Sequence, residues 1–365
     1  MKKLNALSFF TGAGGLDMGI HKAGFNVKLC VEIEKKYCET LKMNHPNWNV
    51  VQGDIMQYNK EKVYKDAKLN DNDVIDLVFG GSPCQSFSTA GKRQAFEDIR
   101  GKAMIKYAEL VEELQPKAFL LENVRGLLSV ALKHRKIEER TKEHPDLTEE
   151  ELPGSAIKYL LSKFKSYNIT VNLVNSANYG VAQKRERVFI IGIRKDLNKT
   201  FEFPEPTHNK SGNKGKKKWV TVADVLEFIG SNVTHEHVTY SNERLKYMRM
   251  IPRGGGNWRN LSDDIAMVAM GGAYNSGGGK VGFFRRVKIN EPSPTLLTSP
   301  IQKSTNLGHP YEDRPLSIQE YLAIQGFPID YKIYGNINDK YTQIGNAVPV
   351  KLAYVIGYAI FNLLK

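Results

Sequence analysis

Short apolar runs alternate with amphipathic segments along the first two hundred residues of the chain. Apolar runs of four to seven residues predict buried strands, and segments whose apolar residues recur every three or four positions predict helices. Strands that alternate with helices indicate an α/β domain with a mostly parallel sheet. The predicted strands are residues 4–10, 27–31, 74–79, 118–121, 169–174 and 187–193, and the predicted helices are residues 16–23, 35–43, 102–114 and 156–164.

The pattern changes after about residue 200. Glycines cluster at 254–256, 271–272 and 277–279, among arginines, asparagines and aromatic residues. Regular helix is not expected through these glycines, so we expect a second domain whose loops carry its function. Near the end of the chain Ser317 predicts the start of a helix, and residues 349–364 predict an apolar helix.

Positive charge is the unusual feature of the composition. The chain of 365 residues has a formal net charge of +13 and a pI near 9.4, which favours a polyanionic partner, most simply nucleic acid. The densest positive run, residues 210–218, is expected to contact phosphates rather than base edges, because a lysine is a flexible point charge. The charged segment 133–151 lacks strand patterning and is expected to be a solvated insertion or a partly disordered loop.

The cysteines and the chain start indicate a cytoplasmic protein. Cys30, Cys38 and Cys84 have neither metal-ligand spacing nor the pattern of a disulfide framework, so no metal is expected and a reducing cytosol fits. The first residues lack the long apolar region of a signal peptide, and no stretch is judged long and apolar enough to span a membrane.

A glycine-rich loop that begins at Phe10 follows the first predicted strand and opens a helix. Glycines let a ligand approach the backbone, and a helix start presents free N–H groups to an anion. Gly12 and Gly14 begin a dinucleotide fingerprint, but Asp17 stands where its third glycine belongs. The fingerprint is therefore incomplete.

Two acidic residues strengthen this loop as a cofactor site. Glu32 lies at the end of the second predicted strand, twenty positions after Gly12, where a carboxylate can accept hydrogen bonds from ribose hydroxyls. Asp54 could accept one from an adenine amino group. A nicotinamide cofactor and S-adenosylmethionine both fit a ribose-binding carboxylate at Glu32.

Cys84 and Glu122 are the candidate catalytic residues. Cys84 follows an apolar run, with glycines behind it, Pro83 before it and small polar residues after it. Glu122 ends the next apolar run. Since ligands bind beyond the carboxyl ends of parallel strands, the two side chains are expected at one edge of the sheet. A thiol and a carboxyl there suit covalent attack with general acid catalysis.

Two further motifs complete a pattern. Residues 183–187 read Gln-Lys-Arg-Glu-Arg, and residues 341–349 read Tyr-Thr-Gln-Ile-Gly-Asn-Ala-Val-Pro. Alternation along an extended segment sends Gln183, Arg185 and Arg187 to one side. Taken in order with the glycine-rich loop and the motifs at Cys84 and Glu122, this set resembles the DNA (cytosine-5) methyltransferases of bacterial restriction-modification systems.

The resemblance covers residues 7–350, except for the 133–151 insertion and a variable region of about 206–282. It implies the Rossmann-like mixed sheet of S-adenosylmethionine-dependent methyltransferases with a second, smaller DNA-recognition domain. Residues 1–200 and 331–365 would form the catalytic and cofactor-binding domain. Residues 201–330 would form the target-recognition domain and hinge.

By the same resemblance the cofactor is S-adenosylmethionine. Phe10 would pack on it, Glu32 would hold its ribose, and Asp54 with Ile55 would meet the adenine. Ile33 stands where many relatives carry an aromatic residue, so adenine stacking would be weaker or supplied differently. The residues implied to bind the cofactor are Phe10, Gly12, Gly14, Gly15, Leu16, Glu32, Ile33, Asp54, Ile55, Pro83, Asn346 and Val348.

The resemblance also implies a mechanism. The thiolate of Cys84 would add to carbon-6 of a flipped-out cytosine, and Glu122 would protonate ring nitrogen 3 so that carbon-5 can be methylated. Arg187 would contact the base and favour the thiolate, and Arg185 would hold the cysteine loop or a phosphate. The residues expected to meet duplex DNA are Gln85, Ser86, Arg253, Asn257, Arg259, Arg285 and Arg286.

The expected partner is double-stranded DNA, bound by a monomer in the bacterial cytoplasm and paired in function with a restriction endonuclease. Three other functions compete with this one. A methyltransferase acting on tRNA is disfavoured by the long basic recognition region and by Ser82, where such relatives tend to carry proline. A non-catalytic DNA-binding protein is disfavoured because Cys84, Glu122 and Arg187 are all present, and a nicotinamide oxidoreductase is disfavoured by Asp17.

Overall fold

The computed structural model describes residues 4–83, 99–135, 146–278 and 280–365. The chain divides into two compact units, each assembled from segments that are distant in the sequence. Unit 1 consists of Met1–Val174, Glu186–Glu205 and Ala353–Lys365, and unit 2 of Asn175–Arg185 and Pro206–Leu352.

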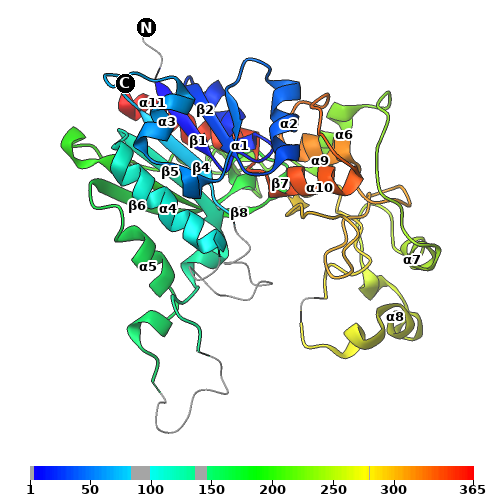
Figure 1. Cartoon of the computed structure of the whole chain (residues 1–365). Coiled ribbons are helices and arrows are strands. Elements are labelled where there is room, and N and C mark those ends of the chain that lie inside the picture. Colours follow the sequence, from blue (N-terminus) through cyan, green and yellow to red (C-terminus); the bar gives the residue numbers. More distant parts are fainter. Residues whose placement is uncertain (1–3, 84–98, 136–145, 279) are drawn as a thin grey trace. The chain divides into compact units, whose positions relative to one another are not determined.

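Unit 1 is built on a seven-stranded sheet with the strand order β3-β2-β1-β4-β5-β8-β6 (Figure 1). The neighbours from β3 to β5 are parallel, and β8 runs antiparallel to β5. The strand order reverses between β1 and β4, and ligands bind at such a switch point, beyond the carboxyl ends of the strands. The strands are β1 (Asn5–Phe9), β2 (Asn26–Glu32), β3 (Val50–Gln52), β4 (Leu77–Gly81), β5 (Ala118–Val124), β6 (Tyr167–Asn175) and β8 (Glu186–Arg194).

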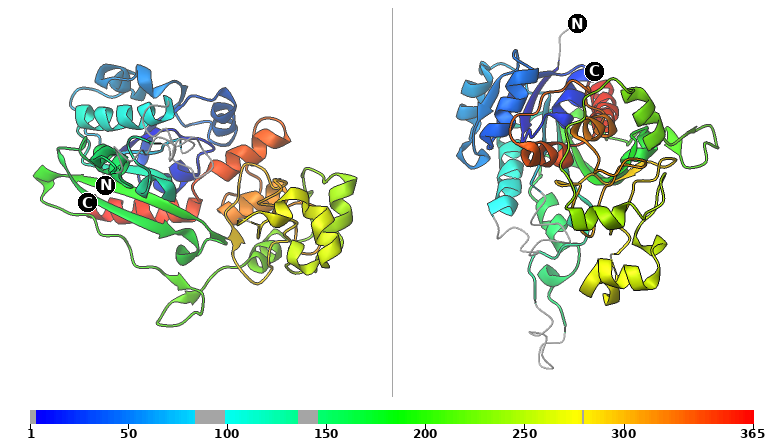
Figure 2. Two further views of the ribbon diagram at one scale, coloured as in Figure 1. Left: turned by 90° about the horizontal axis from the view of Figure 1, so that it is seen from below. Right: turned by 90° about the vertical axis from the view of Figure 1, so that its right-hand side faces the viewer.

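Helices cover both faces of this sheet, which explains why its central strands are apolar along their whole length. On one face α1 packs closely on α11, since a Cβ added to Gly19 would lie 2.3 Å from that of Ala353. On the other face α3, α4 and α5 contribute to the main apolar core. Figure 2 shows α4 and α11 on opposite sides of the strands. These helices are α1 (Gly15–Lys22), α2 (Lys35–Asn44), α3 (Lys60–Ala67), α4 (Ile99–Leu114), α5 (Ser155–Leu161) and α11 (Val350–Leu364).

All strands and helices predicted for the first two hundred residues are present, within three residues of their predicted bounds. The sequence pattern missed β3 and α3. β3 has only three residues and α3 consists mostly of charged ones, so neither carries a long apolar repeat. The mixed α/β fold class is confirmed.

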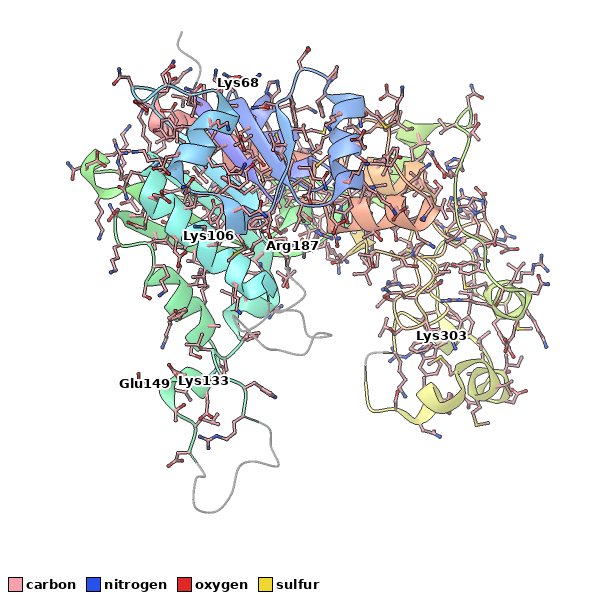
Figure 3. The ribbon with its side chains drawn as sticks, in the orientation of Figure 1. Lys68, Lys106, Lys133, Glu149, Arg187 and Lys303 are labelled. Carbon is pink, nitrogen blue, oxygen red and sulfur yellow. The ribbon has the colours of Figure 1, made fainter. Side chains whose placement is uncertain are left out.

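In the described part of the charged segment 133–151, charged side chains form ion pairs and hydrogen bonds that a solvated loop would not need. Arg135 donates to both carboxylate oxygens of Glu151, at 2.7 and 2.6 Å, and both side chains are largely buried. Thr148 caps the short 3-10 turn Glu149–Glu151, which lies beside Lys133 (Figure 3).

Unit 2 is made of short helices and two small strand pairs. The glycines of its loops lie outside α-helices, as predicted, but α8 forms between the clusters and was not predicted. α9 was predicted, and the Ser317 hydroxyl and the Glu320 carboxylate cap its start reciprocally. The elements are β7 (Gln183–Lys184) with β11 (Ser293–Pro294), β9 (His208–Asn209) with β10 (Lys217–Lys218), α6 (Val222–Ile229), α7 (Asn242–Met248), α8 (Asp263–Met270), α9 (Ile318–Gln325) and α10 (Ile337–Asn346).

Within the described part of the chain one stretch, Ile337–Leu364, has the length and mean hydropathy of a membrane span, contrary to the sequence expectation. It consists of α10 and α11, and 56% of its apolar window is buried inside the protein. Buried core helices have the same composition, so this stretch is weak evidence for a membrane.

Candidate active site

The loop after β1 has the backbone of a ligand-binding turn. Phe10 has φ 57° and Gly12 has φ 59°, and such a value is a strained outlier for a bulky side chain. A Cβ added to Gly12 would meet no heavy atom within 4 Å, so the backbone borders open space. Gly14, also at positive φ, precedes the first residue of α1, and the Phe10 ring lies 6.3 Å from that of Tyr107.

Glu32 ends β2 and ties this loop down. Its Oε2 accepts a hydrogen bond from the Gly12 N–H at 2.7 Å, and its Oε1 accepts one from the Glu34 N–H at 2.9 Å. Burial raises the pKa of the Glu32 carboxyl, while these two N–H groups oppose the rise. Each carboxylate oxygen keeps a second lone pair, so the predicted ribose hydrogen bonds remain chemically available.

Asp17 lies beneath the loop, in the first turn of α1, and is almost fully buried. The Cys30 thiol donates to its Oδ1 at 3.7 Å, and among the described residues its Oδ2 has no hydrogen-bond partner. Burial raises the pKa of Asp17 to about 7. The residue that breaks the dinucleotide fingerprint is therefore a core carboxyl.

The candidate adenine residues follow the ends of β2 and β3. Asp54 accepts a hydrogen bond from the Met56 N–H at 2.9 Å and so opens the 3-10 turn Ile55–Gln57. Ile55 is buried in the core, whereas Ile33 is 57% exposed. Ile33 therefore presents an apolar surface beside Glu32.

Hydrogen bonds join the ends of β4 and β5 at the edge of the sheet where the candidate catalytic residues are expected. Gly81 pairs in register with Glu122, and the Ser82 N–H donates to the Glu122 carbonyl at 3.2 Å. The Asn123 amide donates to the Ser82 hydroxyl at 2.9 Å. The half-buried Pro83 follows, and Cys84, Gln85 and Ser86 lie outside the described residues.

Glu122 is paired with Arg187, the residue opposite the end of its strand. Val124 and Arg187 are register partners across the β5–β8 pair, and the Arg187 Nε lies 3.0 Å from Glu122 Oε1. Both side chains are largely buried. A guanidinium at this distance favours the ionised form of the Glu122 carboxyl. The predicted role of Glu122 as a general acid needs the protonated form, so the ion pair opposes that role.

Gln183 and Arg185 belong to unit 2 and share a side, as the alternation predicts, since both reach Leu296. The Arg185 guanidinium is buried and donates to the carbonyls of Leu296 and Asn346, at 3.1 and 3.3 Å. Asn346 is exposed and Val348 is buried within the same unit.

The predicted DNA-reading residues fall into two groups. Arg286 is 1% exposed, and its guanidinium donates to four carbonyls and to the Asp313 carboxylate, so the prediction that it reads bases is wrong. Arg285 is half-buried, and its Nε donates to the Asn306 carbonyl. Arg253 and Arg259 are exposed, and Asn257 is half-buried.

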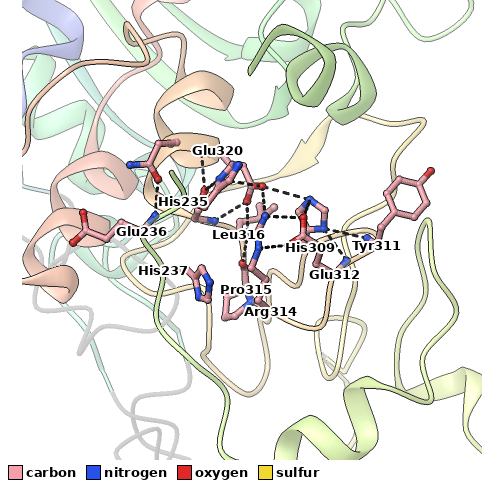
Figure 4. Close-up of polar contacts among 12 residues, drawn as sticks. His235, Glu236, His237, His309, Tyr311, Glu312, Arg314, Pro315, Leu316 and Glu320 are labelled. Carbon is pink, nitrogen blue, oxygen red and sulfur yellow. Dashed lines mark hydrogen bonds and ion pairs between the residues drawn. The ribbon is translucent and has the colours of Figure 1, made fainter. Parts of the chain in front are cut away.

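A buried polar cluster in unit 2 was not predicted (Figure 4). Arg314 forms a bidentate ion pair with Glu320, at 2.9 and 2.8 Å, and Nε2 of His309 lies 3.4 Å from the same carboxylate. Nδ1 of His309 accepts the N–H groups of Tyr311 and Glu312. The only sequence signal was the Ser317–Glu320 cap, which places Glu320 but not its partners.

Comparisons with known proteins agree with this geometry. Residues 4–362 match the family of C-5 cytosine-specific DNA methylases. The chain is 40% identical to the Type II methyltransferase M.Sau96I of Staphylococcus aureus, over 100% of this chain and 77% of that protein. It is 37% identical to M.Eco47II of Escherichia coli, over 98% of this chain and 79% of that protein.

A solved structure shares the fold over the full length. It is a prophage-encoded protein of Escherichia coli described as a DNA modification methyltransferase, with 25% identity, a TM-score of 0.66 and 99% of each chain covered. The sequence resemblance is thereby confirmed. The chain belongs to the C-5 cytosine-specific DNA methylases and is an enzyme that methylates cytosine in DNA with S-adenosylmethionine as methyl donor.

Proposed function

We propose that Cys84 is the nucleophile and Glu122 the general acid of this methyl transfer. The Cys84 thiolate adds to carbon-6 of cytosine, and Glu122 delivers a proton to nitrogen 3, which makes carbon-5 nucleophilic. Bound S-adenosylmethionine supplies the electrophilic methyl group for carbon-5. A base, for which water is the candidate, then takes the carbon-5 proton, the carbon-6–sulfur bond breaks to release the Cys84 thiolate, and nitrogen 3 returns its proton to Glu122. The observation that supports these roles is the fastening of β4 to β5, which brings the residue before Pro83 against Glu122.

Arg187 prepares both groups in this proposal. In the described residues its guanidinium holds the Glu122 carboxylate at 3.0 Å. A nearby cation also favours a thiolate over a thiol, because an unperturbed cysteine is mostly protonated at neutral pH. Entry of the base would have to displace or share this ion pair before Glu122 can act as an acid. Arg185 supports the segment by holding the Leu296 and Asn346 carbonyls.

The cofactor loop of unit 1 fits S-adenosylmethionine. The open space over Gly12 and the strained Phe10 backbone are what a ligand-lined turn requires. Glu32 would hold the ribose, and the exposed Ile33 would cover the adenine. Contacts with the cofactor are also proposed for the other predicted residues of the site, which are Gly14, Gly15, Leu16, Asp54, Ile55, Pro83, Asn346 and Val348.

Residues 201–330 are proposed to choose the target sequence, with the exposed Arg253 and Arg259 and with Asn257 as candidate readers of base edges. The domain boundaries 1–200 with 331–365 and 201–330 remain a proposal. Since the named relatives are Type II methyltransferases of bacteria, a companion restriction endonuclease and a bacterial cytoplasmic setting are proposed as well. A monomer is the proposed functional state.

Cys84→Ser tests the mechanism. A serine hydroxyl is not ionised at neutral pH, so we expect incorporation of labelled methyl groups into DNA to be abolished. Binding of DNA and of S-adenosylmethionine should persist, which separates a chemical defect from misfolding. Substantial turnover by the serine variant would exclude the covalent mechanism.

A chimera tests the recognition region. Residues 201–330 would be replaced by the equivalent region of a relative with a different target, and the methylated positions would be read by methylation-sensitive sequencing. The methylated sequence should become that of the donor. A chimera that still methylates the original sequence would contradict the assignment.

A further inference from the structure

Three basic side chains of unit 2 meet around Gly180, which follows the 3-10 turn Ser176–Tyr179 at φ 76°. A Cβ added to Gly180 would lie 2.6 Å from Nζ of Lys351 and 2.6 Å from Cε1 of His208. It would lie 3.0 Å from Nε2 of His208. The Lys351 ammonium and the edge of the His208 ring therefore both pack against the Cα of Gly180, where any larger residue would collide with them.

Lys217 is the third basic residue. It stands directly opposite His208 in the β9–β10 pair, and its N–H donates to the Thr207 carbonyl at 3.0 Å. The Thr207 hydroxyl lies 2.8 Å from Nδ1 of His208 and so fixes the ring. Two strands and the first turn of α11 thus hold the three side chains in place.

This gathering of like charges has no acidic counterpart among the described residues. Burial first, and then the charge of Lys217, lowers the pKa of Lys351. Burial, Lys351 and Lys217 in that order lower the pKa of His208. No carboxylate contributes to the pKa shift of Lys351 or of His208. In the described part of the chain neither side chain forms an ion pair with a carboxylate. An anion would relieve both the repulsion and the desolvation.

We propose that His208, Lys217 and Lys351 form a binding site for a phosphate group, which the DNA backbone supplies. The proposal rests on the proposed function, because a DNA methyltransferase meets a polymer with one phosphate at each nucleotide. Nζ of Lys351 and Nε2 of His208 provide N–H donors from one side, and Lys217 adds charge from the strand beside them. The lysine-rich turn between β9 and β10 continues the positive surface. A free phosphate ion has the same chemistry and is the other possible source.

Proton uptake is the distinctive consequence. The free protein favours neutral His208, since burial and the two lysines all oppose its charge. A phosphate beside Nε2 favours the imidazolium, so DNA binding takes up protons at this site and strengthens as the pH falls. A structural histidine without a phosphate would show no such coupling.

The experiment compares the full-length enzyme with Lys351→Gln, His208→Asn and a control of equal charge change, Lys68→Gln in unit 1, where Lys68 is exposed (Figure 3). DNA affinity is measured against salt concentration. Lys351→Gln should weaken binding about tenfold and lower the slope of log affinity against log salt by about 0.9, one phosphate contact. Titration calorimetry in buffers of different ionisation enthalpy should show proton uptake that His208→Asn removes.

Inorganic phosphate is the second probe, followed through the His208 ring resonances at millimolar concentration. A shift with DNA alone, together with the weakened Lys351→Gln variant, supports a backbone phosphate. A shift with inorganic phosphate and an unchanged DNA affinity of Lys351→Gln would overturn the assignment to DNA. Affinity, slope and proton uptake equal to those of Lys68→Gln would overturn the site itself. Wild-type protein that neither binds nor methylates DNA in the same assays would instead refute the proposed function.

Discussion

The two units are stabilised by different means. Unit 1 buries a continuous apolar sheet beneath helices, and strands such as β1 and β4 are almost entirely inaccessible. Unit 2 has a small apolar cluster around Tyr247 and Met248 and supplements it with buried ions. Arg286, Arg314 and Glu320 are all less than a tenth exposed.

This difference decides how side chains of the same type behave. In unit 1 two of the buried carboxyl groups, those of Glu32 and Glu122, lie near the carboxyl ends of strands at the ligand edge, whereas Asp17 is buried in α1. In unit 2 the most buried charges hold loop carbonyls together, and the exposed Arg253 adds a hydrogen bond to the Tyr311 carbonyl from the surface. A buried charge at the end of a strand in unit 1 therefore predicts chemistry better than a buried charge in the loops of unit 2.

The largest expected effect comes from Glu122→Gln in unit 1. The amide keeps the size of the side chain but cannot deliver a proton, and loss of a general acid costs about 10²–10⁴ in rate. We expect the kcat for methyl incorporation to fall by that factor, while S-adenosylmethionine affinity changes little.

Glu109→Gln, an exposed change on α4, is the matched control and should leave kcat unaltered. Thermal unfolding of both variants shows whether the unpaired Arg187 destabilises unit 1. Activity of Glu122→Gln within threefold of the wild type would remove Glu122 from the chemical step.

Arg286→Met tests the contrasting behaviour of unit 2. Methionine is uncharged and fills much of the volume, but it leaves Asp313 and the carbonyls of Met248 and His309 without their donor. Removing one partner of a buried ion pair costs about 3–5 kcal/mol, so we expect a large loss of unfolding free energy. Fluorescence of Trp219 and Trp258, both in unit 2, follows the transition in urea.

Arg253→Met is the control for this prediction, because Arg253 approaches the same Asp313 from the surface, at 3.9 Å. Its stability should change by less than about 0.5 kcal/mol, as is usual for exposed positions. If Arg253 reads a base, its variant instead relaxes the choice of target sequence. Equal destabilisation by both variants would contradict the division into buried and reading arginines.

The sequence predicted unit 1 well because its information is local and periodic. β1, β4 and β5 are apolar runs that end at polar residues, and the ends carry Phe10, Ser82 and Glu122. The pairing of Glu122 with Arg187 was not predicted, since it depends on the antiparallel register of β8 against β5. Register of this kind is set by tertiary contacts and has no signature in either strand alone.

The sequence predicted unit 2 poorly for the corresponding reason. α9 was found because a capping residue marks its start, whereas α11, found from its long apolar run, lies mostly in unit 1. α6, α7, α8 and α10 are short and are stabilised by contacts outside themselves. Arg286 follows Arg285 among glycines and aromatics, a context that is typical of a nucleic-acid surface, and only the folded chain shows that its donors are occupied.

The smallest expected effect concerns Asp17, which tests whether the apolar core of unit 1 tolerates a charge beneath its cofactor loop. The pKa of Asp17 is raised from 3.8 to about 7, so the folded state holds a proton that the unfolded state releases. Stability from this group is therefore full below pH 4 and is lost as the pH rises to 7.

Asp17→Asn stays neutral and lacks that loss. Between pH 5 and pH 8 the unfolding free energy of the wild type should fall relative to the variant by about 2–3 kcal/mol. Urea unfolding of both proteins at the two pH values measures this difference, with the exposed Asp71→Asn as control. Parallel pH profiles of wild type and Asp17→Asn would mean that Asp17 is ionised in the core, with the Ser8 hydroxyl and the Cys30 thiol supplying enough hydrogen bonding to hold the charge.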